Sequence, residues 1–355
     1  MKKVLSLLMA LLMLTLCLVS CASETPETPA ESGSEEGSAS ESVSETETED
    51  VLDNYIEMIT YNIAYYKAAG NMEVYYKNQT IDDYGFLKRA QRLDAMVAYF
   101  KPDVLALQEV NRLWWPHIIS GETPIVEKYG YAYEAGESSY GKKSGTQTSQ
   151  DHDMFNLLLW NEKKFEKIKS GVIRLTDNKA DANKDRMCTY AILKNRGTGI
   201  ETLFASVHLC TQGTAETERL NHEQSKKLMT SLESLADGRM IILGGDFNAN
   251  EKDASYTHVT TTKGFLDGRH SAETRKTQMM GTARVWGKDT RWNSGLLPID
   301  HILYKGTTAV AEEWKVMTDT YDKDNNVSTE IGKIGINYDL SDHQGVYTRF
   351  REIVQ

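Results

Sequence analysis

Hydrophobic and polar positions alternate with two different periods along the chain, and they predict strands and helices from about residue 55 onward. Residues 85–100 carry apolar side chains at helical spacing, and Pro102 ends that helix before the apolar run 104–108. A second helical pattern covers residues 216–235 and precedes the apolar strand 240–243. The remaining predicted strands are residues 56–62, 154–160, 186–194, 201–209, 299–304, 313–319 and 345–350.

The order of these elements predicts the fold class. Residues 194–199 supply a turn that joins two of the strands as a hairpin, whereas helices separate other strands. Such a mixture is typical of two mixed sheets that pack together with helices outside them. We therefore expect an α/β fold, a four-layer α/β sandwich of two packed mixed β-sheets flanked by helices, over residues 51–355.

The first 20 residues follow a different pattern. Lys2 and Lys3 precede an apolar run over residues 4–19 that only Ser6 and Thr15 interrupt. This layout is typical of a secretory signal peptide, and the run is short for a transmembrane helix. The pattern therefore predicts export of the chain.

The end of the apolar run, Leu18-Val19-Ser20-Cys21, resembles the lipobox of bacterial lipoproteins. The resemblance implies a lipoprotein signal peptide over residues 1–20 and a diacylated Cys21 at the start of the mature chain. An ordinary signal peptide, in which Cys21 is incidental, is the alternative. Because two acyl chains suffice for stable anchoring, we expect a lipid-anchored protein on the extracytoplasmic face of the cell membrane, with the membrane as its partner.

Composition separates the next segment from the rest of the chain. Residues 21–50 hold ten acidic residues, no basic residue and no aromatic residue, and they are rich in Ser, Glu and Thr. Such a segment cannot bury enough apolar surface to fold, so we expect a disordered acidic tether. Without residues 1–50, the 40 basic and 51 acidic residues of the chain fall to 38 and 41. This near balance does not support a strongly basic nucleic-acid-binding module. Separately, we expect the protein to be a monomer.

Two cysteines, Cys188 and Cys210, fall in the predicted domain. Two Cys in a domain of that length are not a disulfide framework. A pair across adjacent strands is one interpretation, and two free buried thiols are the favoured one.

Polar side chains gather where the predicted strands end. Because strand ends converge in space while the sheet that carries them stays rigid, α/β folds build their sites there. The strand-end residues are Asn62, Gln108-Glu109, His208, Gly244-Gly245-Asp246-Phe247-Asn248, Ile299-Asp300 and Ser341-Asp342-His343-Gln344.

These stretches resemble the endonuclease/exonuclease/phosphatase superfamily, the metal-dependent phosphohydrolases of the pancreatic deoxyribonuclease type. The resemblance spans about residues 55 to 350 and keeps the order of the motifs. Gln-Glu-Val and Ser-Asp-His are common triplets, whereas Gly-Asp-Phe-Asn after an apolar strand is much more specific. The resemblance implies that residues 51–355 form a catalytic domain that hydrolyses phosphate esters.

Hydrolysis of a phosphodiester requires a hard divalent cation on a non-bridging oxygen, and such a cation prefers carboxylate and amide oxygens. Glu109 is the best single candidate for a metal ligand, with Asn62 beside it and Asp342 as a third candidate. Taken alone, Glu109 could equally be a solvated carboxylate at a strand end. We expect Mg²⁺ as the cofactor, with Mn²⁺ as a substitute.

Asp246 and Asn248 stand two positions apart in a segment predicted to be extended, so both side chains are expected to point the same way. One of them would hold or polarise the attacking water while the other donates to the phosphoryl oxygen. The alternative is a local Asx turn after the strand. Gly244 and Gly245 fit a close approach of the backbone.

His343 is the best candidate for the general base, because only His titrates near neutrality without help. The resemblance implies that Asp300, rather than the adjacent Asp342, orients it. It also implies that His208 lies on the other side of the phosphate, as a hydrogen-bond donor or as an acid toward the leaving oxygen. The alternative for His208 is a core histidine with satisfied hydrogen bonds.

Arg186 occupies the Arg position of the family at the start of a predicted strand, where it either touches the phosphate or braces the site. His301 follows Asp300 within a strand and must face away from the site. Relatives of the deoxyribonuclease kind pair the His at 208 with a carboxylate near strand 154–160. Asp153 is the candidate for this role, although it is offset by about one residue from the pattern.

The histidine in Ser206–Leu209 resembles deoxyribonuclease-type nucleases, bacterial sphingomyelinases, deadenylases and inositol-phosphate phosphatases more than abasic-site endonucleases. We expect an extracytoplasmic Mg²⁺-dependent phosphodiesterase, with extracellular nucleic acid as the leading phosphodiester substrate. A phospholipid or sphingomyelin head group and a sugar- or inositol-phosphate are alternatives. Trp114 and Trp115 follow Glu109 closely, and they either wall the substrate cleft or pack loops onto the sandwich.

The alternative to an enzyme is a lipoprotein that binds a partner at the cell surface and catalyses no reaction. It would keep the fold without the chemistry. The presence of Glu109, Asp246, Asn248, Asp300 and His343 together argues against it, because a degenerate site would have lost some of them.

Overall fold

The computed structural model describes residues 53–64, 86–112, 114–137, 154–176, 185–277, 281–283, 297–317 and 341–354. They all belong to one folded unit, Asp50–Gln355. The signal peptide, Cys21, the acidic tether and Asp153 were predicted in segments that lie outside the described residues. Among the helices that are described, none is both long and apolar enough to cross a bilayer.

One sheet has seven strands in the order β10-β12-β13-β1-β2-β4-β3. Its central strands β1 and β2 are parallel, while β13 and β4 run antiparallel to them on either side. This mixed pairing is the one expected from alternating hairpins and helical crossovers. The strands are β1 (Tyr55–Asn62), β2 (Val104–Asn111), β3 (Tyr131–Glu137), β4 (Met154–Asn161), β10 (Thr274–Lys276), β12 (Ala309–Val316) and β13 (Val346–Glu352).

The second sheet has six strands in the order β5-β6-β7-β8-β11-β9. Here β7 and β8 form the parallel pair, and β6 and β11 flank them antiparallel. The strands are β5 (Phe165–Arg174), β6 (Met187–Asn195), β7 (Glu201–His208), β8 (Met240–Asp246), β9 (Leu266–Asp267) and β11 (Asp300–Lys305).

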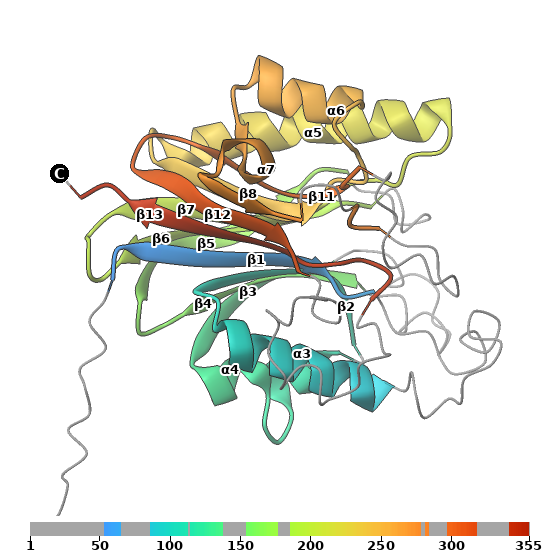
Figure 1. Ribbon diagram of the computed structural model, residues 1–355. Coiled ribbons are helices and arrows are strands. Elements are labelled where there is room, and N and C mark those ends of the chain that lie inside the picture. The colour runs from blue at the N-terminus through green and yellow to red at the C-terminus, as the bar shows by residue number, and fades with distance from the viewer. Residues whose placement is uncertain are drawn as a thin grey trace, which may run out of the picture. The chain divides into compact units, whose positions relative to one another are not determined.

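Helices cover the outer faces of the two sheets. Figure 1 shows α3 (Phe86–Phe100) and α4 (Ile125–Tyr129) on the face of the seven-stranded sheet, and α5 (Ala215–Ala236) with α6 (Ala254–Thr257) on the opposite side, over the six-stranded sheet. Three buried apolar clusters hold these layers together: one lies between the sheets, one under α5 and one under α3. The predicted four-layer α/β sandwich is therefore confirmed. The remaining short helices are η2 (Pro116–Ser120), η4 (His258–Thr262) and α7 (Gly268–Ser271).

The four edge strands β3, β5, β9 and β10 were missed by the sequence pattern. Strands β9 and β10 are only two and three residues long, and exposure explains the other two. Strands β3 and β5 each pair with one neighbour only, so β5 exposes Glu166, Lys167, Ile168 and Lys169 in succession. A strand with so little buried surface has no clear apolar alternation to detect. The strand predicted at 313–319 is instead β12, which begins four residues earlier, at Ala309.

The parallel pairs in both sheets end at the same edge of the sandwich. Asn62 lies opposite Gln108 in one sheet, and His208 and Asp300 both lie opposite Asp246 in the other. The Gly244-Gly245 pair allows this alignment, because a Cβ on Gly245 would lie 2.1 Å from the carbonyl oxygen of Val207. The close approach expected of these glycines is thus to the neighbouring strand at Gly245, and to the side chains of Met58 and Thr60 in the other sheet at Gly244.

The two cysteines of the domain are free and buried. Cys188 lies within β6, and Cys210 follows β7. Burial raises the pKa of the Cys188 thiol, so it is unreactive at neutral pH.

Candidate active site

A β-bulge at the end of β2 positions Glu109. The register between β2 and β4 shifts between Leu107 and Val110, and Glu109 has a φ of +60°, a left-handed conformation that is uncommon outside glycine. Gln108 faces the other sheet and donates a hydrogen bond of 3.0 Å to the hydroxyl of Ser206. The bulge therefore turns the carboxylate of Glu109 out of the alternation of the strand and towards Asn62, at the edge where the parallel pairs end.

Asn62 connects three strands at that edge. Its side-chain amide donates to Glu109 Oε1 at 3.2 Å and to Asp246 Oδ2 at 3.0 Å. Its side-chain oxygen Oδ1 accepts from the backbone N–H of Ala64 at 3.0 Å. The side chain is fully buried. Asn62 thus brings together two carboxylates that belong to different sheets.

The backbone after Asn62 is held by a buried arginine. Arg89 on α3 is 3 % exposed and donates to the carbonyl oxygens of Ile63 and Ala64, the latter at 2.7 Å. Trp114 donates from its indole to the same Ala64 oxygen at 3.1 Å, and its ring lies 5.1 Å from the guanidinium of Arg89. Arg89 was not among the residues predicted for the site. The detectable signal was a charged residue on the apolar side of a predicted helix.

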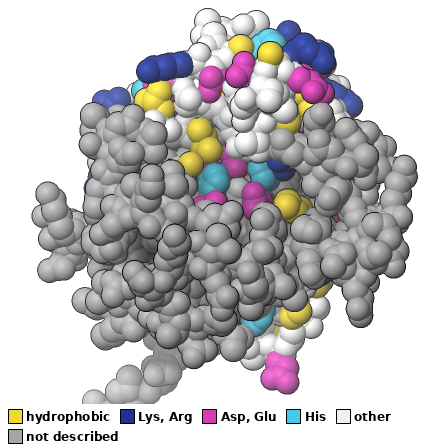
Figure 2. Space-filling view, turned by 90° about the vertical axis from the view of Figure 1, so that its right-hand side faces the viewer, with side chains coloured by type: hydrophobic (Ala, Val, Ile, Leu, Met, Phe, Trp, Pro, Cys, Tyr) yellow, Lys and Arg dark blue, Asp and Glu magenta, His cyan; other side chains and the backbone are white. Residues whose placement is uncertain are grey.

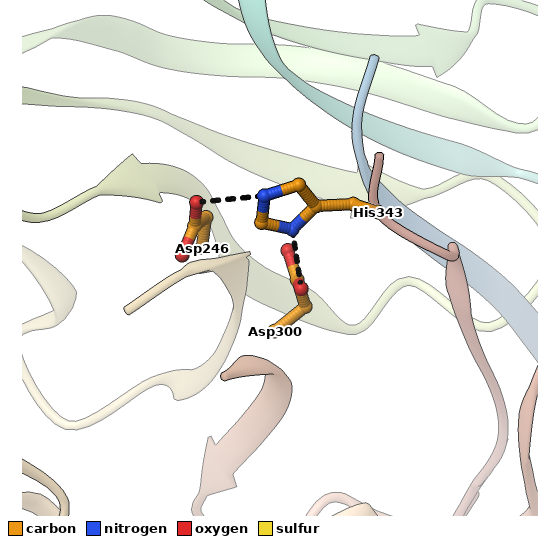
Figure 3. A group of neighbouring side chains, drawn as sticks. All are labelled: Asp246, Asp300 and His343. Atoms are coloured by element: carbon orange, nitrogen blue, oxygen red, sulfur yellow. Dashed lines mark hydrogen bonds and ion pairs between the residues drawn. The ribbon is translucent and has the colours of Figure 1, made fainter. Parts of the chain in front are cut away.

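His343 and Asp300 form a hydrogen-bonded pair. His343 Nδ1 lies 2.8 Å from Asp300 Oδ2, and both side chains are almost completely buried. The hydroxyl of Ser341 accepts from the backbone N–H of His343 at 3.1 Å and donates to the carbonyl oxygen of Asn62 at 2.5 Å. Figure 3 shows the imidazole between Asp300 and Asp246, with one ring nitrogen toward each. The pairing that the family resemblance implied is therefore present.

Asp246 is the central carboxylate of the cluster. Its Oδ2 lies 3.3 Å from Nε2 of His208 and 3.8 Å from Nε2 of His343. His208 Nε2 also lies 4.0 Å from Glu109 Oε1. Both histidines therefore face one buried acid.

The local conformation after Asp246 differs from the extended segment that the sequence predicted. Asn248 has a φ of +47°, and its N–H donates to Asp246 Oδ1 at 2.8 Å, which makes an Asx turn. The side-chain amide of Asn248 donates to the carbonyl oxygen of Leu209 at 3.0 Å. Asp246 and Asn248 are therefore not side by side on one strand face, because the turn rotates the second residue out of the strand.

Burial and charge shift the protonation of this cluster. Desolvation, and then the charge of Asp300, raise the pKa of Asp246 to about 7. Burial alone would lower the pKa of His343, but Asp300 and Asp246 outweigh it and raise that pKa well above its usual range. Burial, and then the charges of Arg186 and His343, lower the pKa of His208 well below its usual range. At neutral pH the two histidines therefore differ in charge.

The other predicted residues occupy the periphery. Arg186 precedes β6, is 7 % exposed, and its charge acts on His208. Asp342 is half-buried and accepts from the hydroxyl of Ser341 at 3.3 Å. His301 faces away, as predicted, with Nδ1 3.1 Å from Asp267 and Nε2 2.9 Å from the carbonyl oxygen of Ala249. Figure 2 shows histidine and acidic side chains gathered at the centre of the face where the strands end.

The donor chemistry of the site fits a hard divalent cation. Glu109, Asn62 and Asp342 offer carboxylate and amide oxygens, the ligands that Mg²⁺ and Mn²⁺ prefer. Asp246, Asp300 and His343 also place one ligand atom each within 4.8 Å of one another. Nδ1 of His343 is already hydrogen-bonded to Asp300 Oδ2, however, so that nitrogen is not available to a cation. Asp300 Oδ1 is buried and accepts no hydrogen bond from the described residues.

A family model described as the endonuclease/exonuclease/phosphatase family matches residues 59–343. No curated protein matches the chain significantly. Among solved structures, a family protein from Bacteroides thetaiotaomicron is 19 % identical with a TM-score of 0.61, covering 83 % of this chain and 94 % of its own.

Two further structures share the fold. A mannosyl-6-phosphatase from Bacteroides thetaiotaomicron is 20 % identical with a TM-score of 0.61, and the match covers 83 % of this chain and 99 % of that one. The catalytic domain of human Nocturnin with bound sulfate is 16 % identical with a TM-score of 0.57, and the match covers 85 % and 96 %. At these identities the likeness is one of architecture.

Proposed function

The chain belongs to the endonuclease/exonuclease/phosphatase family, and on that premise we propose that it is an exported, lipid-anchored, Mg²⁺-dependent phosphodiesterase that cleaves nucleic acid outside the cytoplasm. Membership makes it a metal-dependent phosphoric ester hydrolase. The metal, the substrate and the location are the proposed parts.

One observation carries the proposed chemistry: the buried Asp300–His343 pair points its free ring nitrogen at Asp246, beside Asn62 and Glu109. An acid that holds one nitrogen of an imidazole fixes its tautomer and stabilises its charged form. The remaining nitrogen then faces the space in which a water and a phosphate would meet. A structural histidine would instead have both nitrogens engaged by the fold, as His301 does.

In the proposed reaction a water oxygen forms a bond to phosphorus as the bond from phosphorus to the leaving oxygen breaks. His343 takes the proton of the water on Nε2, while Asp300 holds Nδ1. Burial lowers the pKa of His208, so in the proposed reaction it donates a hydrogen bond to the phosphate rather than a proton, and the leaving oxygen takes its proton from solvent water. Arg186 adds positive charge next to His208.

Glu109 and Asn62 would hold the cation, with Asp342 as a third ligand. When bound, the cation neutralises charge on a phosphoryl oxygen and lowers the pKa of the nearby imidazole towards the neutral form that a base needs. Asn62 already spaces Glu109 from Asp246 through two hydrogen bonds. The chain's own contribution is therefore to keep these carboxylates ordered before the substrate arrives.

Nucleic acid is the proposed substrate because a phosphodiester in solution can be cleaved without a lipid-binding element. The mannosyl-6-phosphatase of Bacteroides thetaiotaomicron has the same fold, so a sugar phosphate is the second candidate. Lipid head groups and a purely binding lipoprotein are the remaining alternatives.

The test is hydrolysis of bis-p-nitrophenyl phosphate with Mg²⁺, with Mn²⁺ and with EDTA, alongside single-stranded DNA, RNA, a hexose 6-phosphate and sphingomyelin vesicles. We expect turnover of the small diester and of nucleic acid in either metal, and none in EDTA. Turnover of the hexose phosphate or of the vesicles alone would reassign the substrate. A lack of turnover with every substrate and metal would favour a binding lipoprotein.

A further inference from the structure

A hollow lies near the end of β2. It has a volume of about 350 Å³ and is lined by Arg112, Trp115, Pro116, Glu137 and Phe155. None of these residues takes part in the chemistry proposed above. The hollow lies where β2, β3 and β4 meet the segment that leads into η2.

The position of this hollow relative to Glu109 follows from the strand register. Arg112 comes three residues after Glu109, a separation of at most about 10 Å along the chain. Phe155 on β4 pairs with Val110, the residue next to Glu109. Val110 and Phe155 pack in the cluster under α3, whereas Gln108 faces the other sheet. The hollow is therefore on the other side of the end of β2 from the catalytic cluster.

An aromatic side chain forms a fixed wall of the hollow. The ring of Trp115 lies 4.7 Å from the ring of Phe155, tilted by 44°, and 6.1 Å from Tyr133 in an edge-to-face arrangement. Its neighbour Trp114 is fully buried and packs under the sheet. Trp115 is partly buried against the same cluster under α3, so the packing alternative raised by the sequence applies to both residues, and Trp115 in addition lines the hollow.

A donor and an acceptor stand on the rim of the hollow. Arg112 Nη2 lies 4.0 Å from Glu137 Oε1, and the side chains are 49 % and 32 % exposed. An ion pair at this distance and exposure contributes little to stability. A guanidinium and a carboxylate beside an aromatic face match the edge of a nucleobase, which presents donors and acceptors in the plane of its ring.

We propose that this hollow binds a nucleobase of the substrate strand, stacked on Trp115 with its polar edge toward Arg112 and Glu137, so that the enzyme engages a strand beyond the scissile phosphate. This inference rests on the proposed function. A substrate whose phosphate lies at Glu109 must extend past the end of β2 to place a ring in the hollow. An extended polymer can reach both places. The alcohol of a small phosphate monoester is bonded to the phosphate itself and stays next to it.

Binding of a fluorescent single-stranded oligonucleotide tests the proposal without turnover, in a His343→Ala background. Trp115→Ala should weaken binding about 5- to 150-fold, the range for loss of one base–aromatic stack. Trp115→Phe should retain most of the affinity. Tyr99→Ala, which removes an exposed aromatic side chain on α3, is the matched control and should not change it. Thermal melting of each variant identifies a loss of folding.

Oligonucleotides with an abasic position identify the base that occupies the hollow. One such position should weaken binding to the parent protein but have little further effect on Trp115→Ala, because the stack is already lost. Equal affinity of Trp115→Ala and its parent would overturn the proposal. So would a Trp115→Ala variant that loses activity on a hexose 6-phosphate and keeps its affinity for the oligonucleotide. Hydrolysis of bis-p-nitrophenyl phosphate by the wild-type protein tests the proposed function separately.

Discussion

His343 Nδ1 lies 2.8 Å from Asp300 Oδ2, although the two residues are 43 positions apart in the chain. Asp300 opens β11, and its backbone N–H donates to the hydroxyl of Thr282 at 3.0 Å. His343 is held from the other sheet through Ser341 and Asn62. Thr282 also accepts from the backbone N–H of Gln344 at 2.7 Å, and Ala283 forms a β-bridge with His343. The segment 281–283 therefore holds both partners of the pair in place.

If His343 is the general base, His343→Ala should lower kcat by about 10²–10⁴-fold, the range for a positioned acid–base group. Asp300→Asn keeps the shape but loses the charge that holds the tautomer, so its loss should approach that of His343→Ala. The double variant should be little worse than either single one, because the two residues act as a unit. Steady-state kinetics on bis-p-nitrophenyl phosphate measure all three.

Thermal melts must accompany these kinetics, since both side chains are buried and a folding defect would also lower activity. Losses that multiply in the double variant would show that the residues act independently. Asp246, which lies within 3.8 Å of both histidines, would then be the preferred base.

Removal of divalent cations should abolish turnover, and Mg²⁺ or Mn²⁺ should restore it, because the proposed ligands are hard oxygens. Glu109→Gln keeps the size of the side chain and removes its charge, so the Mg²⁺ concentration for half-maximal activity should rise at least about tenfold. A Mg²⁺ titration of initial rates measures this. Glu223→Gln on the exposed face of α5 is the control and should leave the titration unchanged. Full activity in EDTA would rule out the metal.

Arg89→Met should lower both stability and apparent Mg²⁺ affinity. The substitution removes two charge-assisted hydrogen bonds, to Ile63 and Ala64, each worth about 1.5–3 kcal/mol. It also frees the backbone that carries Asn62. Urea unfolding measures the first effect, and a Mg²⁺ titration of activity measures the second.

Trp114→Phe provides a comparison that keeps Arg89, because it removes the indole N–H that binds Ala64 and part of the buried ring that lies against the Arg89 guanidinium. We expect Trp114→Phe to lower both the stability and the apparent Mg²⁺ affinity, each by less than Arg89→Met does. If Arg89→Met lowers stability but leaves the Mg²⁺ titration unchanged, Arg89 supports the fold and does not position Asn62.

Much of this site was predictable because its residues follow apolar runs that end at one edge. Glu109, His208, Asp246, Asp300 and His343 all come directly after or before such a run, and two sheets bring them together. What the pattern does not contain is the conformation of single residues. The left-handed turn at Asn248 depends on a carbonyl oxygen of Leu209, which belongs to a different strand end.

The supporting residues were harder to predict for the same physical reason. Arg89 is buried only because Ile63 and Ala64 present carbonyl oxygens to it, and these belong to another element. The edge strands β3 and β5 are defined by pairing on one side rather than by burial. In both cases the determinant is a tertiary contact, and local periodicity does not report it.

The buried pair Asp267–His301 should give stability a pH dependence on two sides. Burial opposes both charges, but His301 lowers the pKa of Asp267 and Asp267 raises that of His301. The contribution of Asp267 is present above about pH 4 and is lost as pH falls through its lowered pKa. That of His301 is present below about pH 6.5 and is lost as pH rises through its raised pKa.

Asp267→Asn should therefore cost about 3–5 kcal/mol between these limits, the range for breaking a buried pair, and less on either side. Urea unfolding of both proteins across pH 3–9 measures the difference. Asp237→Asn is a suitable control, because Asp237 is an exposed helix cap with a φ of +48°, a conformation that Asn also adopts. A difference that does not vary with pH would mean that the pair is not charged.

Cys21→Ala should release the protein from membranes without changing its turnover, because the proposed lipid and the acidic tether both precede the catalytic domain. Two acyl chains hold a protein at a bilayer stably, whereas a polar tether with ten acidic residues has no affinity of its own for an anionic surface. Fractionation of cells that express each form, with a wash at high salt, measures the release. Cys17→Ala is the matched control, since Cys17 lies inside the predicted signal peptide and its loss should leave the mature protein anchored. If Cys21→Ala stays in the membrane fraction after the wash, an uncleaved apolar run at residues 4–19 is the anchor, and the lipobox interpretation is wrong.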